Sequence, residues 1–71
     1  MADSVYKVIE LVGTSSESWE KAAAAAVSQA ARSLRDLRIA EVVETDMVVQ
    51  NGKVKAYRAR VKVSFKFEGK K

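Results

Sequence analysis

Residues 4–12 of the chain have the sequence SVYKVIELV, and this stretch decides the fold. It is rich in β-branched side chains, which predicts a strand. Successive side chains of a strand point to opposite faces, so its apolar residues form two sets. Val5, Ile9 and Leu11 lie on one face, and Tyr6, Val8 and Val12 lie on the other. A strand that is apolar on both faces is covered on both faces. One helix covers only one of them, so we expect a second copy of the chain to cover the other.

The length and composition also indicate that the chain needs a partner. Its 71 residues make one domain, residues 1–71. A domain of this size buries only about 60% of the surface that its unfolded chain exposes. The chain has no Cys and no His, which excludes disulfides, thiolate metal sites and the usual zinc sites. Oligomerisation is the remaining way to gain stability.

The charge is moderately basic. Thirteen Lys and Arg residues oppose nine Asp and Glu residues, giving a formal net charge of +4. This charge is compatible with anionic partners but does not require them. No apolar run approaches the ~18 residues that a membrane span needs, and the N-terminus lacks a signal-peptide pattern. We therefore expect no membrane association and a cytoplasmic location.

A helix is expected to follow the first strand. The segment from Thr14 to Glu17 has the pattern of a capping box, with Ser15 as an alternative cap. The helix is expected to run from about residue 16 to residues 34–36. Its apolar positions have the spacing of one buried stripe. They are Trp19, Ala23, Ala26, Val27, Ala30, Leu34 and Leu37.

Two further strands are expected over residues 38–50 and 53–68. Between them Asn51-Gly52 favours a two-residue type I′ turn, which needs a positive φ at both positions. The element order is then β-α-β-β. This is an α+β fold with a three-stranded antiparallel sheet packed on one helix. A right-handed crossover through the helix favours pairing of the first strand with the third.

The two-residue turn fixes which residues face each other across the hairpin. It places Glu41 opposite Lys62, a favourable pair of opposite charges, and Val42 opposite Val61. The same register puts Glu44 and Asp46 on the apolar side, where a covering helix would bury two carboxylates at high cost. Either a bulge shifts the register or the hairpin projects past the helix. We favour projection, because each strand spans about 40 Å and a 20-residue helix only about 30 Å.

Several segments of the chain carry a family resemblance. They are residues 5–15 (VYKVIELVGTS), Glu41-Val42, Asn51-Gly52-Lys53, Tyr57 and residues 61–66 (VKVSFK). Together they resemble the dodecins, from about Val5 to Glu68. The resemblance implies a non-catalytic protein that forms a hollow homododecamer built from trimers. It also implies a small-molecule cargo, usually FMN or riboflavin, stacked between Trp side chains at the trimer contacts.

Two positions depart from the flavin-binding pattern of that family. Its flavin-binding members have a Trp just after the helix, where this chain has Ile39, and a Gln after the tyrosine, where Arg58 follows Tyr57. Ile39, Tyr57 and Arg58 are therefore the candidate cofactor-binding residues. An aromatic partner adds about 0.5–1.5 kcal/mol beyond area burial, which Ile39 does not supply. The pattern resembles a branch without the stacking Trp, some members of which have been linked to calcium. Trp19, the only Trp, is expected to pack in the core or at an interface.

Calcium is the alternative cofactor, and it binds through about six to eight oxygen atoms. Glu44 and Asp46 are the candidate metal ligands, with Glu10, Asp36 and Glu41 as further carboxylates. The chain has no EF-hand-like loop. Symmetry axes bring copies of one carboxylate together, so such a site is expected at subunit contacts.

Arg58, Arg60, Lys62 and Lys66 form a basic ladder on one face of the third expected strand. The ladder suits the phosphates of a nucleotide-like ligand or of nucleic acid. We favour instead pairing with the carboxylates of the second strand across subunits, or solvation. No aromatic side chains interleave with these charges as they do in RNA-binding sheets, so nucleic acid is not the expected partner.

Catalysis finds no support in the sequence. Without His or Cys, a nucleophile would need a Lys or a carboxylate as its base. Ser15, Ser16 and Ser18 are explained by helix capping. We therefore expect a binding protein and no enzymatic activity.

Overall fold

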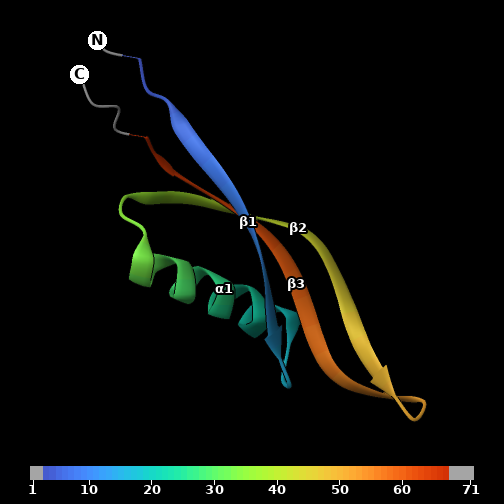
Figure 1. The fold of residues 1–71 in the computed structure, drawn as a ribbon. Coiled ribbons are helices and arrows are strands. Elements are labelled where there is room, and N and C mark those ends of the chain that lie inside the picture. Colours follow the sequence, from blue (N-terminus) through green and yellow to red (C-terminus); the bar gives the residue numbers. More distant parts are fainter. Residues whose placement is uncertain (1–2, 68–71) are drawn as a thin grey trace.

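The structure is a computed structural model, and it describes residues 3–67. Four elements follow one another along the chain (Figure 1): β1 (Tyr6–Ser15), α1 (Trp19–Ser33), β2 (Leu37–Gln50) and β3 (Lys53–Lys66). The expected β-α-β-β order and α+β class are confirmed. Glu68, the expected end of the third strand, lies outside the described residues.

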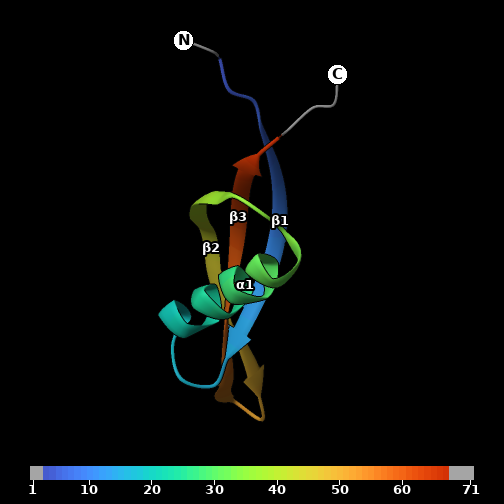
Figure 2. The same cartoon turned by 90° about the vertical axis from the view of Figure 1, so that its left-hand side faces the viewer.

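The three strands form one antiparallel sheet in the order β1-β3-β2, which confirms the pairing of the first strand with the third. Helix α1 lies across one face of the sheet (Figure 2) and packs mainly on β1 and β3. Within residues 3–67 no element covers the other face, which we call the outer face. On β3 the outer face carries Arg58, Arg60, Lys62 and Ser64, which alternate with the buried residues of that strand.

The core between α1 and β3 is small. Its buried residues are Ala22, Ala26 and Ala30 of α1 and Ala59, Val61 and Val63 of β3. The expected stripe included Ala26 and Ala30 but omitted Ala22. It also included Trp19, which is 38% exposed, and Leu37, which instead begins β2. Because the side chains on both elements are short, the helix backbone lies close to the sheet.

Gly13 of β1 occupies the closest approach between helix and sheet. A Cβ built on Gly13 would lie 2.0 Å from the carbonyl oxygen of Ala22 and 3.2 Å from the Cβ of Ala26. No side chain fits at that distance from a backbone oxygen. Gly13 therefore determines how closely α1 packs on β1.

We expect Gly13→Ala to destabilise the protein by about 3 kcal/mol, because the added methyl forces the helix away from the sheet. At this chain length that corresponds to a fall in Tm of more than about 10 °C. Gly52→Ala is the control, since Gly52 has a φ of +72° and nothing within 4 Å of an added Cβ. Its cost is backbone strain of about 1 kcal/mol. Circular dichroism melts at equal protomer concentration measure both, and a Gly13→Ala protein that melts with the wild type would contradict the packing.

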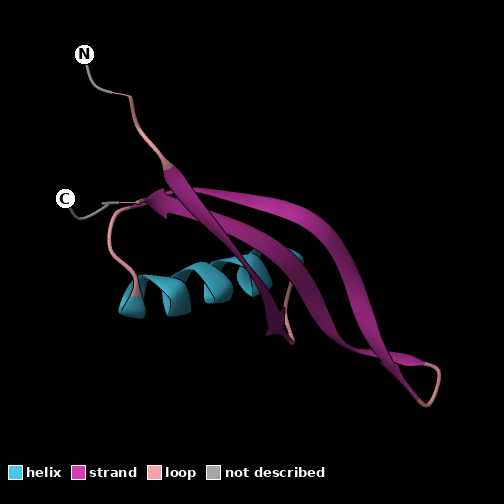
Figure 3. Ribbon diagram, turned by 45° about the horizontal axis from the view of Figure 1, so that its top comes forward, coloured by secondary structure: helices cyan, strands magenta, loops and turns pink. Residues whose placement is uncertain are grey.

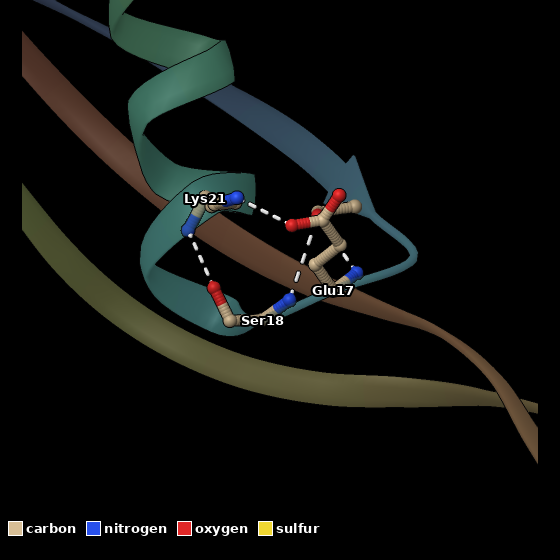
Figure 4. A network of polar contacts seen from close by, with 4 residues as sticks. Glu17, Ser18 and Lys21 are labelled. Carbon is tan, nitrogen blue, oxygen red and sulfur yellow. Dashed lines mark hydrogen bonds and ion pairs between the residues drawn. The ribbon is translucent and has the colours of Figure 1, made fainter.

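The start of α1 differs from the expected capping box. Ser18 is the N-cap, and its Oγ accepts a hydrogen bond from the backbone N–H of Lys21 at 3.0 Å. The Ser15 Oγ accepts from the N–H of Glu17 at 2.9 Å and so shapes the loop before the helix. Glu17 forms an ion pair with Lys21 across the first turn instead of reaching back to a cap (Figure 4).

Among the described residues no helix has the length and apolar character of a membrane span.

The turn between β2 and β3 is the one the sequence predicts. Asn51 has a φ of 54° and Gly52 a φ of 72°, the two positive values that a type I′ turn requires. The expected pairs Glu41–Lys62 and Val42–Val61 are also formed. The register predicted from the turn is therefore observed in the pairs next to the turn. It is observed again at Glu41–Lys62 and Val42–Val61.

Between these points two irregularities change the register. They lie at Val42/Glu44 and at Val48/Val49. The expected placement of Glu44 and Asp46 on the apolar side is therefore wrong, because the shifts move both carboxylates to the outer face. The hairpin also projects past α1, as Figures 1 and 3 show. Both expected alternatives, a bulge and a projecting hairpin, therefore occur. The bulges are what keep Glu44 and Asp46 off the face that the helix covers.

The protomer is long and thin. Its extents are 55 × 20 × 16 Å and its radius of gyration is 14.9 Å, whereas a compact chain of this length has a radius of about 11 Å. Its accessible surface is 5580 Å², against about 4,400 Å² for a compact monomer of this mass. Tyr6, Val8, Val12 and Ile39 are exposed on the outer face, Ile39 by 64%. The expected uncovered apolar face is therefore confirmed for the protomer.

Candidate functional site

The outer face carries a band of alternating charge. The positive row is Arg58, Arg60 and Lys62 on β3. The facing residues of β2 are Asp46, Glu44 and Glu41, and Glu10 of β1 lies opposite Lys62. Three of the four ladder residues thus face carboxylates of their own chain, whereas Lys66 lies opposite Tyr6. The expected pairing across subunits is wrong for Asp46 and Glu44, which meet their arginines within one protomer.

Asp46 and Arg58 form the strongest pair of this band. Arg58 donates from Nε to Oδ1 and from Nη2 to Oδ2 of Asp46, both at 2.7 Å. This two-point contact fixes the plane of the guanidinium as well as its charge. The hydrogen bonds from Arg58, aided by the charges of Arg58 and Arg60 and partly opposed by desolvation, lower the pKa of Asp46. The same hydrogen bonds to Asp46 raise the pKa of Arg58.

Arg60 joins two carboxylates from the two edge strands. Its Nε lies 3.3 Å from Oε1 of Glu44 on β2 and 4.0 Å from Oε2 of Glu10 on β1. These side chains are all more than a third exposed, so each contact contributes modestly to stability. Together they hold the two edge strands to β3 through their side chains. They also neutralise the positive charge that a phosphate ligand would otherwise meet.

Trp19 connects the start of α1 to the hairpin. Its indole Nε1 donates to the backbone oxygen of Asp46 at 3.0 Å. Its ring meets Tyr57 edge to face, with centroids 5.1 Å apart and an interplanar angle of 72°. Trp19 is 38% exposed, so the expected place in the core is wrong, and its expected place at an interface stays a prediction. The hydrogen bond to Asp46 had no signal in the sequence, because the two residues lie 27 positions apart.

An apolar groove lies between β1 and α1. Its volume is about 370 Å³, and its apolar walls include Ile9 and Leu11 of β1 and Ala25 and Leu34. Gln29 adds a polar group to the lining. Sequence reasoning missed this groove. The run of alanines from Ala22 to Ala26 was its only signal, since small helical residues beside an edge strand leave a hollow.

The three candidate cofactor-binding residues do not meet within one protomer. Ile39 lies opposite Ser64 and Arg58 lies opposite Asp46, both on the outer face. The rise along β3 places about 20 Å between them. Tyr57 lies on the other face, against Trp19. A pocket that uses all three must therefore combine residues from more than one copy.

The two candidate metal ligands do not form a metal site in one protomer. Glu44 is held by Arg60 and Asp46 by Arg58. Residues 3–67 contain no group of three or more acidic side chains placed to hold a metal ion. Calcium needs about six to eight oxygens, so these residues of a single protomer do not fit it.

Comparison with known proteins agrees with this architecture. The family model described as Dodecin matches residues 5–68. The chain belongs to the dodecin family. Dodecins are non-catalytic proteins that bind ligands and form homododecamers, so the expectation of a binding protein is confirmed.

Two dodecins of known source share much of this sequence. Calcium dodecin of Mycobacterium tuberculosis is 52% identical over 63 residues, which are 89% of this chain and 89% of that protein. Dodecin of Thermus thermophilus is 42% identical over 64 residues, 90% of this chain and 93% of that protein. A crystal structure of the M. tuberculosis protein, described with a calcium-binding site, has a TM-score of 0.81 and 50% identity. It covers 94% of this chain, and 96% of that chain is matched.

We expect Asp46→Asn to lower the Tm of this dodecin at neutral pH by a few degrees and to have less effect in acid. Because the folded-state pKa of Asp46 lies below its ordinary value of 3.8, the pair is fully stabilising above that value. Its contribution is lost as the pH falls through the lowered pKa. The difference in Tm between wild type and Asp46→Asn should therefore shrink between pH 5 and the lowest pH at which both fold. Arg58→Lys, which keeps the charge without the two-point contact, is the companion variant, and a pH-independent difference for Asp46→Asn would contradict the pairing.

Proposed function

We propose that this chain forms a hollow homododecamer, built from trimers, that stores or sequesters a small ligand without transforming it. Membership of the dodecin family supports this proposal, since the dodecin fold implies a dodecamer. The observation that carries it is the bare outer face of β1. Tyr6, Val8 and Val12 stay exposed there, while the largest fully buried side chains in the described residues are only Val61 and Val63.

This small core explains why the protomer needs assembly. A chain that buries mainly alanine and valine gains little from the hydrophobic effect, which is worth about 25 cal/mol per Å² of apolar surface. Covering the exposed apolar side chains with further copies supplies the missing burial. Native mass spectrometry tests the proposal directly, because it reports copy number and retained ligand together. We expect twelve copies, and a monomer would contradict the proposal.

For the ligand site we propose Ile39, Tyr57 and Arg58 from different copies. Ile39 is the most exposed of the three, so it is free to contact a ligand at a subunit interface. The two hydrogen bonds to Asp46 fix the orientation of the Arg58 guanidinium, whose remaining N–H groups can donate to a ligand. A flavin at this site would touch Ile39 without aromatic stacking. We therefore group the chain with dodecins that lack the stacking Trp, and we expect its affinity for FMN or riboflavin to be low.

We expect Ile39→Trp to increase riboflavin affinity roughly two- to tenfold, since aromatic stacking adds about 0.5–1.5 kcal/mol beyond area burial. Quenching of riboflavin fluorescence measures the affinity, with Ile39→Leu as the control for a change of shape alone. Equal affinities for wild type, Ile39→Leu and Ile39→Trp would place the ligand elsewhere. Native mass spectrometry of the same samples shows whether the dodecamer persists.

Calcium-dependent assembly is a second candidate function. It is favoured by the 52% identity to a protein called calcium dodecin. In this chain Glu44 and Asp46 would have to leave Arg60 and Arg58, or to act together with carboxylates of other copies. The arginine contacts make this the weaker of the two candidates.

Chelation separates the two candidate functions. We expect EDTA to leave the mass and the Tm of the particle unchanged, because Glu44 and Asp46 are already paired with arginines. Dissociation on EDTA that calcium reverses and magnesium does not would establish the second candidate instead. Glu44→Gln is the matched variant, since it removes a carboxylate and keeps the shape.

A further inference from the structure

Besides the outer face, residues 3–67 expose further unpartnered apolar surfaces, two of which have matching properties. One is the groove between β1 and α1. The other is the end of the hairpin that projects past α1, residues 47–54, which we call the arm (Figures 1 and 3). We propose that the arm of one copy packs into the β1–α1 groove of a neighbouring copy. The proposal rests on the proposed assembly and states which surfaces form one of its contacts.

The groove has the character of a protein-binding site. Ile9, Leu11 and Leu34 form its apolar walls, and Ala25 leaves room between them. Thr14, Gln29 and Ser33 add hydroxyl and amide groups to the lining. Such a surface, apolar with a few hydrogen-bonding groups, suits a partner that brings both side chains and backbone groups. The groove is open to solvent because β1 is an edge strand of the sheet.

The arm has matching properties. Met47, Val48, Val49 and Val54 are all exposed, Val49 by 62%. The last side-chain contacts that tie this end of the hairpin to α1 are those of Trp19 with Asp46 and Tyr57. Beyond them the hairpin extends past the end of α1 (Figure 1), and these apolar side chains of the arm stay exposed. The turn itself is polar, with Asn51 at its tip, and so can face the hydroxyl and amide groups of a groove.

The two surfaces cannot satisfy each other within one chain. The strand order places β1 at one edge of the sheet and β2 at the other. The hairpin runs away from α1 (Figures 1 and 2), whereas the groove is lined by residues of α1 and β1. A contact between two different surfaces on identical copies is heterologous, and it closes into a ring when the rotation between copies allows. Three copies linked arm to groove make such a ring.

The exposed area has the size that this contact requires. The protomer exposes roughly 1,200 Å² more than a compact monomer of its mass. A stable protein–protein interface buries about 800 Å² on each partner. The excess surface is therefore larger than one partner's share of a standard interface, and the projecting arm contributes part of it (Figure 1).

Engineered disulfides test the contact. The chain has no cysteine of its own, so every cross-link comes from the introduced residues. The test pair is Ala25→Cys in the groove with Val49→Cys on the arm. The control pair is Ser28→Cys with Val49→Cys, since Ser28 lies one turn further along α1, is exposed and does not line the groove. Mild oxidation and a non-reducing gel should show covalent dimers and trimers in most chains of the test pair and few in the control pair or in the single variants.

Native mass spectrometry of the unoxidised proteins separates this inference from the assembly itself. A monomeric wild type would overturn the assembly and the contact together. Dodecamers in which the test pair links no more than the control pair would overturn only the contact. The thiol of Ala25→Cys could also react freely in the assembled particle and be protected only by added riboflavin. That result would show that the groove is a ligand site and would overturn the contact.

A second pair of variants does not depend on disulfide geometry. Val49→Asp and Val5→Asp change the same residue type at the same exposed fraction, 62%, but only Val49 lies on the arm. Neither change buries a charge in the protomer, so both variants should keep its fold. We expect Val49→Asp to raise the concentration at which the particle dissociates by tenfold or more, and Val5→Asp to leave it near the wild-type value. Equal dissociation of the two variants would overturn the assignment of the arm.

Discussion

The fold of the protomer depends on how closely the helix packs on one face of the sheet. Ala22, Ala26 and Ala30 form one buried cluster with three residues of the central strand, and the absence of a side chain at Gly13 of β1 allows the approach. This packing is tight but small in area, so it supplies little hydrophobic stabilisation. The helix also covers only one face of the sheet. The incomplete core and the uncovered outer face therefore have the same origin, which is a single short helix set against a long sheet.

The outer face combines charge pairing with exposed apolar residues. In the middle of the sheet the carboxylates of the edge strands meet the arginines of β3, with Asp46 and Arg58 in a two-point contact. These pairs satisfy the charges inside the protomer, so further copies do not have to provide partners for them. The apolar side chains around them, such as Val8 and Ile39, remain available for contacts between copies. This division of roles is consistent with a family that assembles as homododecamers.

Much of the architecture could be predicted from short-range patterns. The two-faced strand at Val5–Val12 predicted an uncovered layer, and Asn51-Gly52 predicted the turn, because both signals depend on neighbouring residues. The helix start could not be predicted, since several hydroxyl residues compete for the cap and only the path of the loop selects Ser18. No glycine or proline marks the bulges in the sequence. The face on which Asp46 lies could therefore not be predicted, because it depends on how the whole hairpin pairs. The candidate site residues Ile39, Tyr57 and Arg58 are placed by the fold, but a pocket that unites them requires several copies, which a single chain does not specify.

The central claim is that the protomer is folded only as part of an assembly. Sedimentation velocity combined with far-ultraviolet circular dichroism over a dilution series tests it most directly. We expect one sharp species of twelve times 7.8 kDa at high concentration, and loss of secondary structure at the same dilution at which that species disappears. A 7.8 kDa species that keeps its β and helical signal at micromolar concentration would contradict it.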